Sequence, residues 1–175
     1  MNNENEFIKE FINQETINSL EIFLKNEEDF EESADIIAKT FGFTKNFSQM
    51  NDSDIQKLVI SFKNNLTLLI QKTWVEKSDI ALKDQLLYKL ESFLVDEKSS
   101  FTENYELFRD IINQAVFLMF GQSTDSPEFA IYTLRIDPEF GIFWWYISSL
   151  PNIITWSEKK CKIAMLLGMY FLANY

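Results

Sequence analysis

Proline and glycine are nearly absent from the first two thirds of the chain. No proline precedes residue 127, and Gly42 is the only glycine before residue 121. Because these two residue types mark the turns of β-rich proteins and interrupt helices, their distribution favours long helices over strands. The 175 residues, 46% of them apolar, are enough for one core without a metal or a disulfide. The sequence therefore predicts a single all-α domain over residues 1–175, a non-repetitive, bundle-like array of roughly seven to eight helices.

Apolar residues recur at helical spacing along most of the chain. Ser53 and Gln56 are spaced as a capping box, and Trp74 ends the most regular apolar stripe, so we expect Trp74 in the core. The last helix is apolar on nearly every side, which is typical of a central buried helix. The predicted helices cover residues 7–24, 30–41, 53–74, 78–94, 100–121 and 157–174, with two short ones at 126–136 and 137–147.

The side chains of most common enzyme mechanisms are missing. The chain contains no histidine and one cysteine, Cys161. A disulfide scaffold, a Cys/His zinc site and the Ser-His-Asp and Cys-His arrangements of hydrolases are therefore excluded. Cys161 lies among lysines, which lower a thiol pKa, but no histidine base exists to work with it, so we interpret it as structural. No cofactor is expected.

Acidic residues are concentrated at the N-terminal end. The chain has 27 acidic and 16 basic residues, and residues 1–35 contain eleven of the acids but only two lysines. The segment 1–41 is thus predicted to be an acidic, amphipathic part of the domain. Negative charge repels phosphate backbones, and Arg109 and Arg135 are the only arginines, so direct nucleic-acid binding is not expected. A protein partner, if basic, would be attracted.

The acidic run Glu27-Glu28-Asp29-Phe30-Glu31 has a spacing known from metal sites. Its Glu-Glu-x-x-Glu pattern is similar to the one with which all-helical nucleoside-triphosphate pyrophosphatases hold Mg²⁺. The Glu-x-x-Asp pairs of this chain, Glu32 with Asp35 and Glu76 with Asp79, are not separated from that run as they are in those enzymes. A solvated helix N-terminus explains the same acids, so no family is assigned. The candidate Mg²⁺ ligands are Glu27, Glu28, Glu31 and Asp35.

The C-terminal part, residues 122–175, is rich in aromatic residues and contains all three prolines. Trp144, Trp145 and Tyr146 are consecutive, and neighbouring side chains on a helix point about 100° apart, so they cannot all face one small core. Three interpretations of segment 140–156 stay open: a hydrophobic centre, a contact surface for another protein, and a pocket for an apolar small molecule.

We therefore expect a non-catalytic protein-interaction module: an inhibitor, adaptor or regulatory subunit. The first residues lack the features of a signal peptide and Pro151 breaks the longest uncharged run, so a cytoplasmic protein without a membrane span is predicted. Three alternatives remain: an acidic inhibitor of a basic partner, such as an immunity protein or nucleic-acid mimic; a Mg²⁺-dependent nucleotide hydrolase; and an apolar-ligand carrier. Homo-oligomerisation is left open. The predicted partner-binding residues are Glu28, Glu31, Glu32, Trp144, Trp145 and Tyr146.

Overall fold

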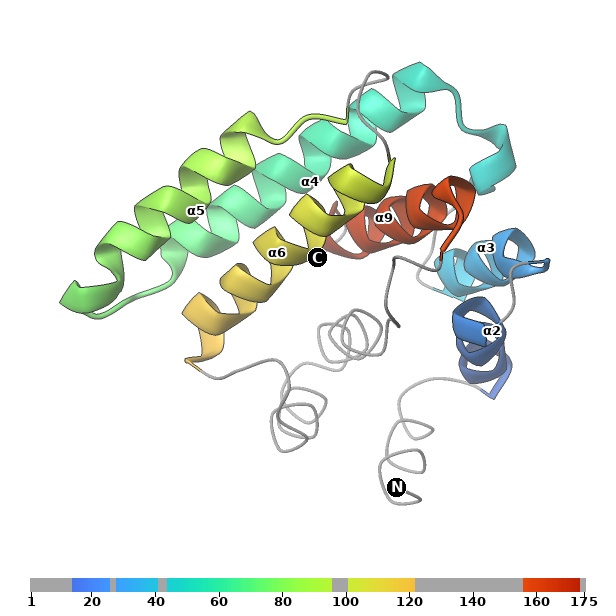
Figure 1. Cartoon of the computed structure of the whole chain (residues 1–175), viewed down its shortest axis with the longest axis horizontal. Helices are drawn as coiled ribbons and strands as arrows, with labels where there is room; N and C mark the ends of the chain where they lie inside the picture. Colours follow the sequence, from blue (N-terminus) through green and yellow to red (C-terminus); the bar gives the residue numbers. More distant parts are fainter. Residues whose placement is uncertain (1–13, 26–27, 41–43, 96–100, 122–155, 174–175) are drawn as a thin grey trace.

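The computed structural model describes residues 14–25, 28–40, 44–95, 101–121 and 156–173, and within these ranges the chain is helical and has no strand. The predicted all-α class is confirmed. The predicted short helices at 126–136 and 137–147 lie outside the described residues, as does the segment 7–13. The α-helices are α2 (Gln14–Lys25), α3 (Phe30–Thr40), α4 (Asp52–Lys72), α5 (Ile80–Ser92), α6 (Phe101–Phe120) and α9 (Glu158–Ala173), with 3-10 turns η1 (Phe47–Gln49) and η2 (Lys77–Asp79) (Figure 1).

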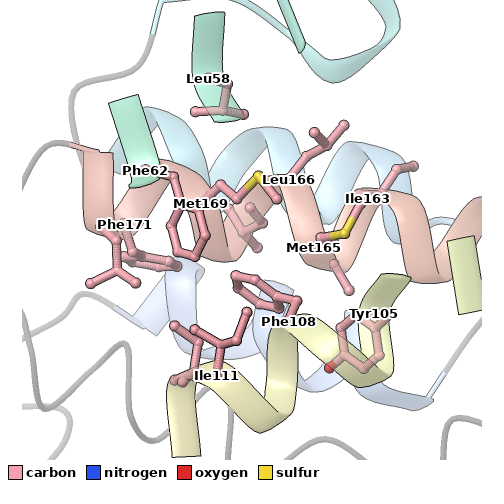
Figure 2. Packing of buried hydrophobic residues seen from close by; sticks show 14 of the residues in the cluster. Leu58, Phe62, Tyr105, Phe108, Ile111, Ile163, Met165, Leu166, Met169 and Phe171 are labelled. Atoms are coloured by element: carbon pink, nitrogen blue, oxygen red, sulfur yellow. The ribbon is translucent and has the colours of Figure 1, made fainter. Parts of the chain in front are cut away.

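Helix α9 lies at the centre of the described part. It packs against α4, α6 and α3 and buries residues on every side (Figure 1). Figure 2 shows its Met169 close to the ring of Phe62 from α4, and its Met165 on the side that faces Phe108 and Tyr105 of α6. Burial of one such side chain contributes roughly 1.5–3 kcal/mol, so this cluster is the main source of stability. The sequence prediction of a buried final helix is confirmed.

Helices α4 and α5 form an antiparallel hairpin whose ends are capped by each other's lysines. Lys63 of α4 donates to the carbonyl oxygen of Glu91 in the last turn of α5. Lys83 of α5 donates to the carbonyl oxygens of Gln71 and Thr73 at the end of α4, at 3.3 and 2.8 Å. Because the last carbonyls of a helix have no partner inside it and carry partial negative charge, each ammonium group stabilises the helix that it caps.

The capping box at the start of α4 is not the predicted one. The Asn51 side chain accepts a hydrogen bond from the backbone N–H of Asp54 at 2.9 Å, and the Asp54 carboxylate accepts one from the N–H of Asn51 at 3.2 Å. The helix thus begins two residues earlier than the box at Ser53 and Gln56 predicted. Lys45 binds Asp54 at 2.9 Å, and this hydrogen bond holds the pKa of Asp54 below its usual value, which favours the ionised acceptor.

Trp74 is not in the core, and the sequence prediction for it is wrong. Helix α4 ends at Lys72, and Thr73 is its C-cap with an extended backbone (φ −76°, ψ 122°). Trp74 therefore leaves the helical phase that buries Phe62, Leu66 and Ile70, and 82% of its surface is exposed. At the end of α6 the predicted stop is confirmed: Gly121 has φ +67° and donates its N–H to the carbonyl oxygen of Phe117 at 2.8 Å, an αL cap.

Candidate functional site

The acidic residues around the start of α3 face different surroundings. Glu28 and Glu32 are exposed. Glu31 forms an ion pair with Lys159 at the start of α9, with Oε2 and Nζ 2.9 Å apart. Asp35 accepts a hydrogen bond from the backbone N–H of Phe47 in η1 at 2.8 Å. Two of these carboxylates thus fasten α3 to neighbouring elements, and two are available to solvent.

These side chains do not come together as a metal site within the described ranges. No group of three or more acidic, histidine or cysteine side chains there is arranged to hold a metal ion. Burial raises the pKa of Asp35 above its usual value, and the hydrogen bond from Phe47 only partly opposes this effect. Glu27, the remaining candidate ligand, lies outside the described residues. Within the described residues, the acidic run therefore offers exposed charge at Glu28 and Glu32.

Cys161 is buried in α9, consistent with the structural role predicted for it. Its thiol accepts a hydrogen bond from Oγ1 of Thr102 in α6, with a donor–acceptor distance of 3.9 Å. Burial raises the pKa of the thiol above its usual value, and the lowering effects of Thr102 and Lys160 are smaller. A thiol in this state is a poor nucleophile.

Lys160 has a charged side chain inside the core, which sequence reasoning missed. Only 2% of its surface is exposed. Its Nζ lies 4.5 Å from the ring centroid of Trp156 and 5.9 Å from that of Phe23, so two aromatic faces attract the cation. The Tyr105 ring packs against Trp156, with centroids 5.9 Å apart. Trp156 is therefore a core residue, whereas Trp144, Trp145 and Tyr146 lie outside the described residues.

The most unusual exposed feature is Trp74 in the turn between α4 and α5. Two further exposed apolar side chains, Phe117 and Ile80, each line a hollow that Trp74 also lines, and they are 44% and 47% exposed. We call this region the Trp74 surface and define it by residues Trp74, Val75, Glu76, Asp79, Ile80 and Phe117. Exposed aromatic rings in such groups are typical of protein contact sites.

Two hollows adjoin the Trp74 surface, and Trp74 and Val75 line both of them. The α6-side hollow, of about 350 Å³, lies between the turn and the last turn of α6, from Phe117 to Gly121. The α5-side hollow, of about 470 Å³, lies between the turn and the first part of α5. Their volumes suit side chains of a partner.

The turn itself is held in place by backbone hydrogen bonds and by Lys83. The N–H of Asp79 donates to the carbonyl oxygen of Glu76 at 2.9 Å, which closes η2. The hydroxyl of Thr73 donates to the carbonyl oxygen of Leu69 at 2.8 Å, and Lys83 binds the carbonyl of Thr73 itself. The backbone on both sides of Trp74 is therefore fixed, which lowers the entropy cost of using the ring as a contact.

A signal for this surface was present in the sequence. Lys72 and Thr73 directly precede Trp74, and a lysine in the last turn is typical of a helix end. The exposed position of the ring depends on where α4 stops, and that was not predicted.

Comparison with known proteins gives no functional information. The chain matches no protein-family model, no curated protein sequence and no solved structure. Among the helices that the structure describes, none is both long enough and apolar enough to cross a bilayer. Function is therefore inferred from the chain's own residues.

Proposed function

We propose that this chain is a non-catalytic, cytoplasmic protein-interaction module that binds a basic protein through the Trp74 surface. The observation that carries this proposal is the exposure of Trp74, a residue type that folded chains normally bury and that dominates binding energy at protein interfaces. The surrounding apolar side chains and the two hollows supply the complementary shape that such a contact needs.

The acidic residues of α3 support the basic nature of the partner. Glu28 and Glu32 are exposed, and the whole chain carries a net charge of −11. Such a field speeds the encounter with a basic protein and contributes less once the two surfaces are in contact. The pair Glu31–Lys159 already uses one of the predicted partner-binding carboxylates inside the molecule. An inhibitor of a basic protein is the version of this function that the charge favours.

The proposal is tested by capture on the immobilised chain with two matched aromatic variants. Tyr88 on α5 is 74% exposed and lines neither hollow, so Tyr88→Ala is the control for Trp74→Ala. A hot-spot residue contributes 2 kcal/mol or more, so we expect a retained protein to bind the Trp74→Ala variant about thirtyfold more weakly, and the control as well as the wild type. Equal retention by all three proteins would contradict the proposal.

The contribution of α3 is tested by kinetics with the captured partner. Charge reversal with Glu28→Lys and Glu32→Lys should slow association and leave dissociation nearly unchanged. The rate should also fall between about 0.01 M and 0.15 M salt, because the Debye length shrinks from about 30 to about 8 Å. If neither the charge reversal nor the added salt altered the association rate, Glu28 and Glu32 would have no role in binding.

A further inference from the structure

The two hollows beside Trp74 differ in charge. Among the described residues that line the α6-side hollow, the charged ones are Glu76 and Asp79, both acidic. The α5-side hollow is lined by two lysines, Lys72 and Lys83, and by one acid, Asp84. Lys77, which lies between Glu76 and Asp79 in η2, lines neither of them. The same tryptophan thus separates an acidic hollow from one that is mainly basic.

The end of α6 adds to the negative potential of the α6-side hollow. Its last turn, including Leu118, Met119 and the C′ residue Gly121, lines this hollow. The C-terminal end of a helix carries partial negative charge, which attracts cations. A methyl group built on Gly121 would meet no atom within 4 Å, so the backbone there borders open space. Acidic side chains and a helix end therefore act in the same direction.

We propose that the α6-side hollow binds an arginine side chain from an apolar segment of the partner protein. This inference depends on the proposed function, because it assigns chemistry to the surface through which the partner binds. A guanidinium group stacks on an indole face and donates two parallel hydrogen bonds to a carboxylate, so it suits Trp74 together with Glu76 or Asp79. The aliphatic stem of the arginine packs on Phe117 and Met119, which line the same hollow.

The two carboxylates are free to take part in binding. Asp79 is the N-cap residue of α5 and Glu76 that of η2, yet neither side chain makes a capping hydrogen bond. No ion pair to either residue exists within the described part of the chain. Replacing Glu76 and Asp79 with neutral residues should therefore leave the fold intact, and a change in affinity of such a variant can be interpreted as an effect on binding.

The test is calorimetric titration of the full chain with a short synthetic peptide of alternating leucine and arginine, and with its twin in which citrulline replaces each arginine. We expect the arginine peptide to bind the wild type about tenfold more tightly than the neutral twin does. The double variant Glu76→Gln, Asp79→Asn and the variant Trp74→Ala should each lose about tenfold in affinity for the arginine peptide. The double variant Glu91→Gln, Glu106→Gln removes the same net charge at exposed positions of α5 and α6 that line neither hollow, and should keep the wild-type affinity within about twofold.

Several results would overturn the arginine site. These are no binding of the arginine peptide to the wild type, equal binding of the two peptides, and an equal loss in both double variants, which would indicate attraction to net charge alone. Self-association of the wild type that Trp74→Ala abolishes would assign the hollow to a second copy of the chain. If a captured partner bound the Trp74→Ala variant weakly but bound the Glu76→Gln, Asp79→Asn variant as tightly as the wild type, the arginine site would be overturned and the proposed function would stand.

Discussion

The ammonium group of Lys83 lies 2.8 Å from the carbonyl oxygen of Thr73, the residue directly before Trp74. A residue in the first part of α5 thus ends α4 and, by the same bond, fixes the backbone that presents the tryptophan to solvent. Lys83 also binds the carbonyl of Gln71, so its ammonium group is already engaged in hydrogen bonds within the hairpin, although Lys83 also lines the α5-side hollow. The same hydrogen bond therefore stabilises the end of α4 and positions Trp74 for binding a partner.

Replacing Lys83 with methionine should destabilise the protein by about 1 kcal/mol. The substitution keeps the aliphatic stem and removes the donor, which leaves the carbonyls of Gln71 and Thr73 with solvent as their only further partner. Denaturant unfolding measures the free energy. Lys77→Met is the control, since Lys77 is exposed and a surface change normally alters stability by no more than about 0.5 kcal/mol. Equal effects of the two substitutions would deny Lys83 a capping role.

Truncation of Trp74 to alanine should cost less than about 1 kcal/mol of folding free energy. The ring is mostly exposed in the folded protein, so its removal loses little buried apolar surface. Truncation of Phe108, which is fully buried against Phe62 and Tyr105, should cost about 3–5 kcal/mol. Chemical denaturation of both variants gives the comparison. A loss of several kcal/mol for Trp74→Ala would mean that Trp74 is buried in the core, as its position in the apolar stripe had predicted.

Two features that depend on local sequence spacing were predicted correctly: the end of α6 and the central position of the final helix. Gly121 ends α6 as expected, because a residue at positive φ is needed there and glycine adopts it without strain. The final helix is central as predicted, because apolar residues on all its faces have to be covered on all sides. Both features depend on residues close together in the sequence.

The candidate site depended on contacts between distant residues. The end of α4 is capped by Lys83, ten residues beyond Thr73, and no periodicity indicates that bond. Glu28, Glu31 and Glu32 were predicted together as partner-binding residues, but Glu31 is paired with Lys159 from the other end of the chain. Burial of Lys160 likewise requires Phe23 and Trp156 to meet around it. Such pairings are set by tertiary packing, which overrides the local pattern.

Asp35 should make stability depend on pH in an unusual direction for a carboxylate. Burial raises its pKa in the folded state, so the folded protein holds the proton more tightly than the unfolded chain. The stability from this group is therefore complete below the unfolded pKa, near 3.8, and is lost as the pH rises through the folded value. We expect Asp35→Asn to be more stable than the wild type at pH 7 and to lose this advantage as the pH falls towards 4.

The matched substitution at this position is Asp35→Ala. It removes the acceptor of the Phe47 N–H, which the amide oxygen of asparagine retains, and should cost about 1 kcal/mol at pH 7. Unfolding curves at several pH values separate the two effects. If alanine and asparagine behaved alike at pH 7, the hydrogen bond to η1 would contribute nothing measurable.

Replacing Tyr105 with phenylalanine should stabilise the protein by about 1 kcal/mol. The side chain is fully buried, and its hydroxyl has no hydrogen-bond partner among the residues that the structure describes, so its removal ends a desolvation cost without losing a contact. Tyr170→Phe is the comparison, because the Tyr170 hydroxyl donates to Sδ of Met50 at 3.5 Å, and that variant should lose a few tenths of a kcal/mol.

Alkaline conditions give the Tyr105 substitution a second readout. Burial raises the pKa of the phenol above its usual value of 10.0, so the unfolded chain ionises first and the wild type loses stability as the pH rises beyond that value. The advantage of Tyr105→Phe should therefore grow above pH 10, as urea unfolding at increasing pH would show. A Tyr105→Phe variant that is less stable than the wild type at neutral pH would mean that the hydroxyl is hydrogen-bonded in solution, to water or to a bound molecule.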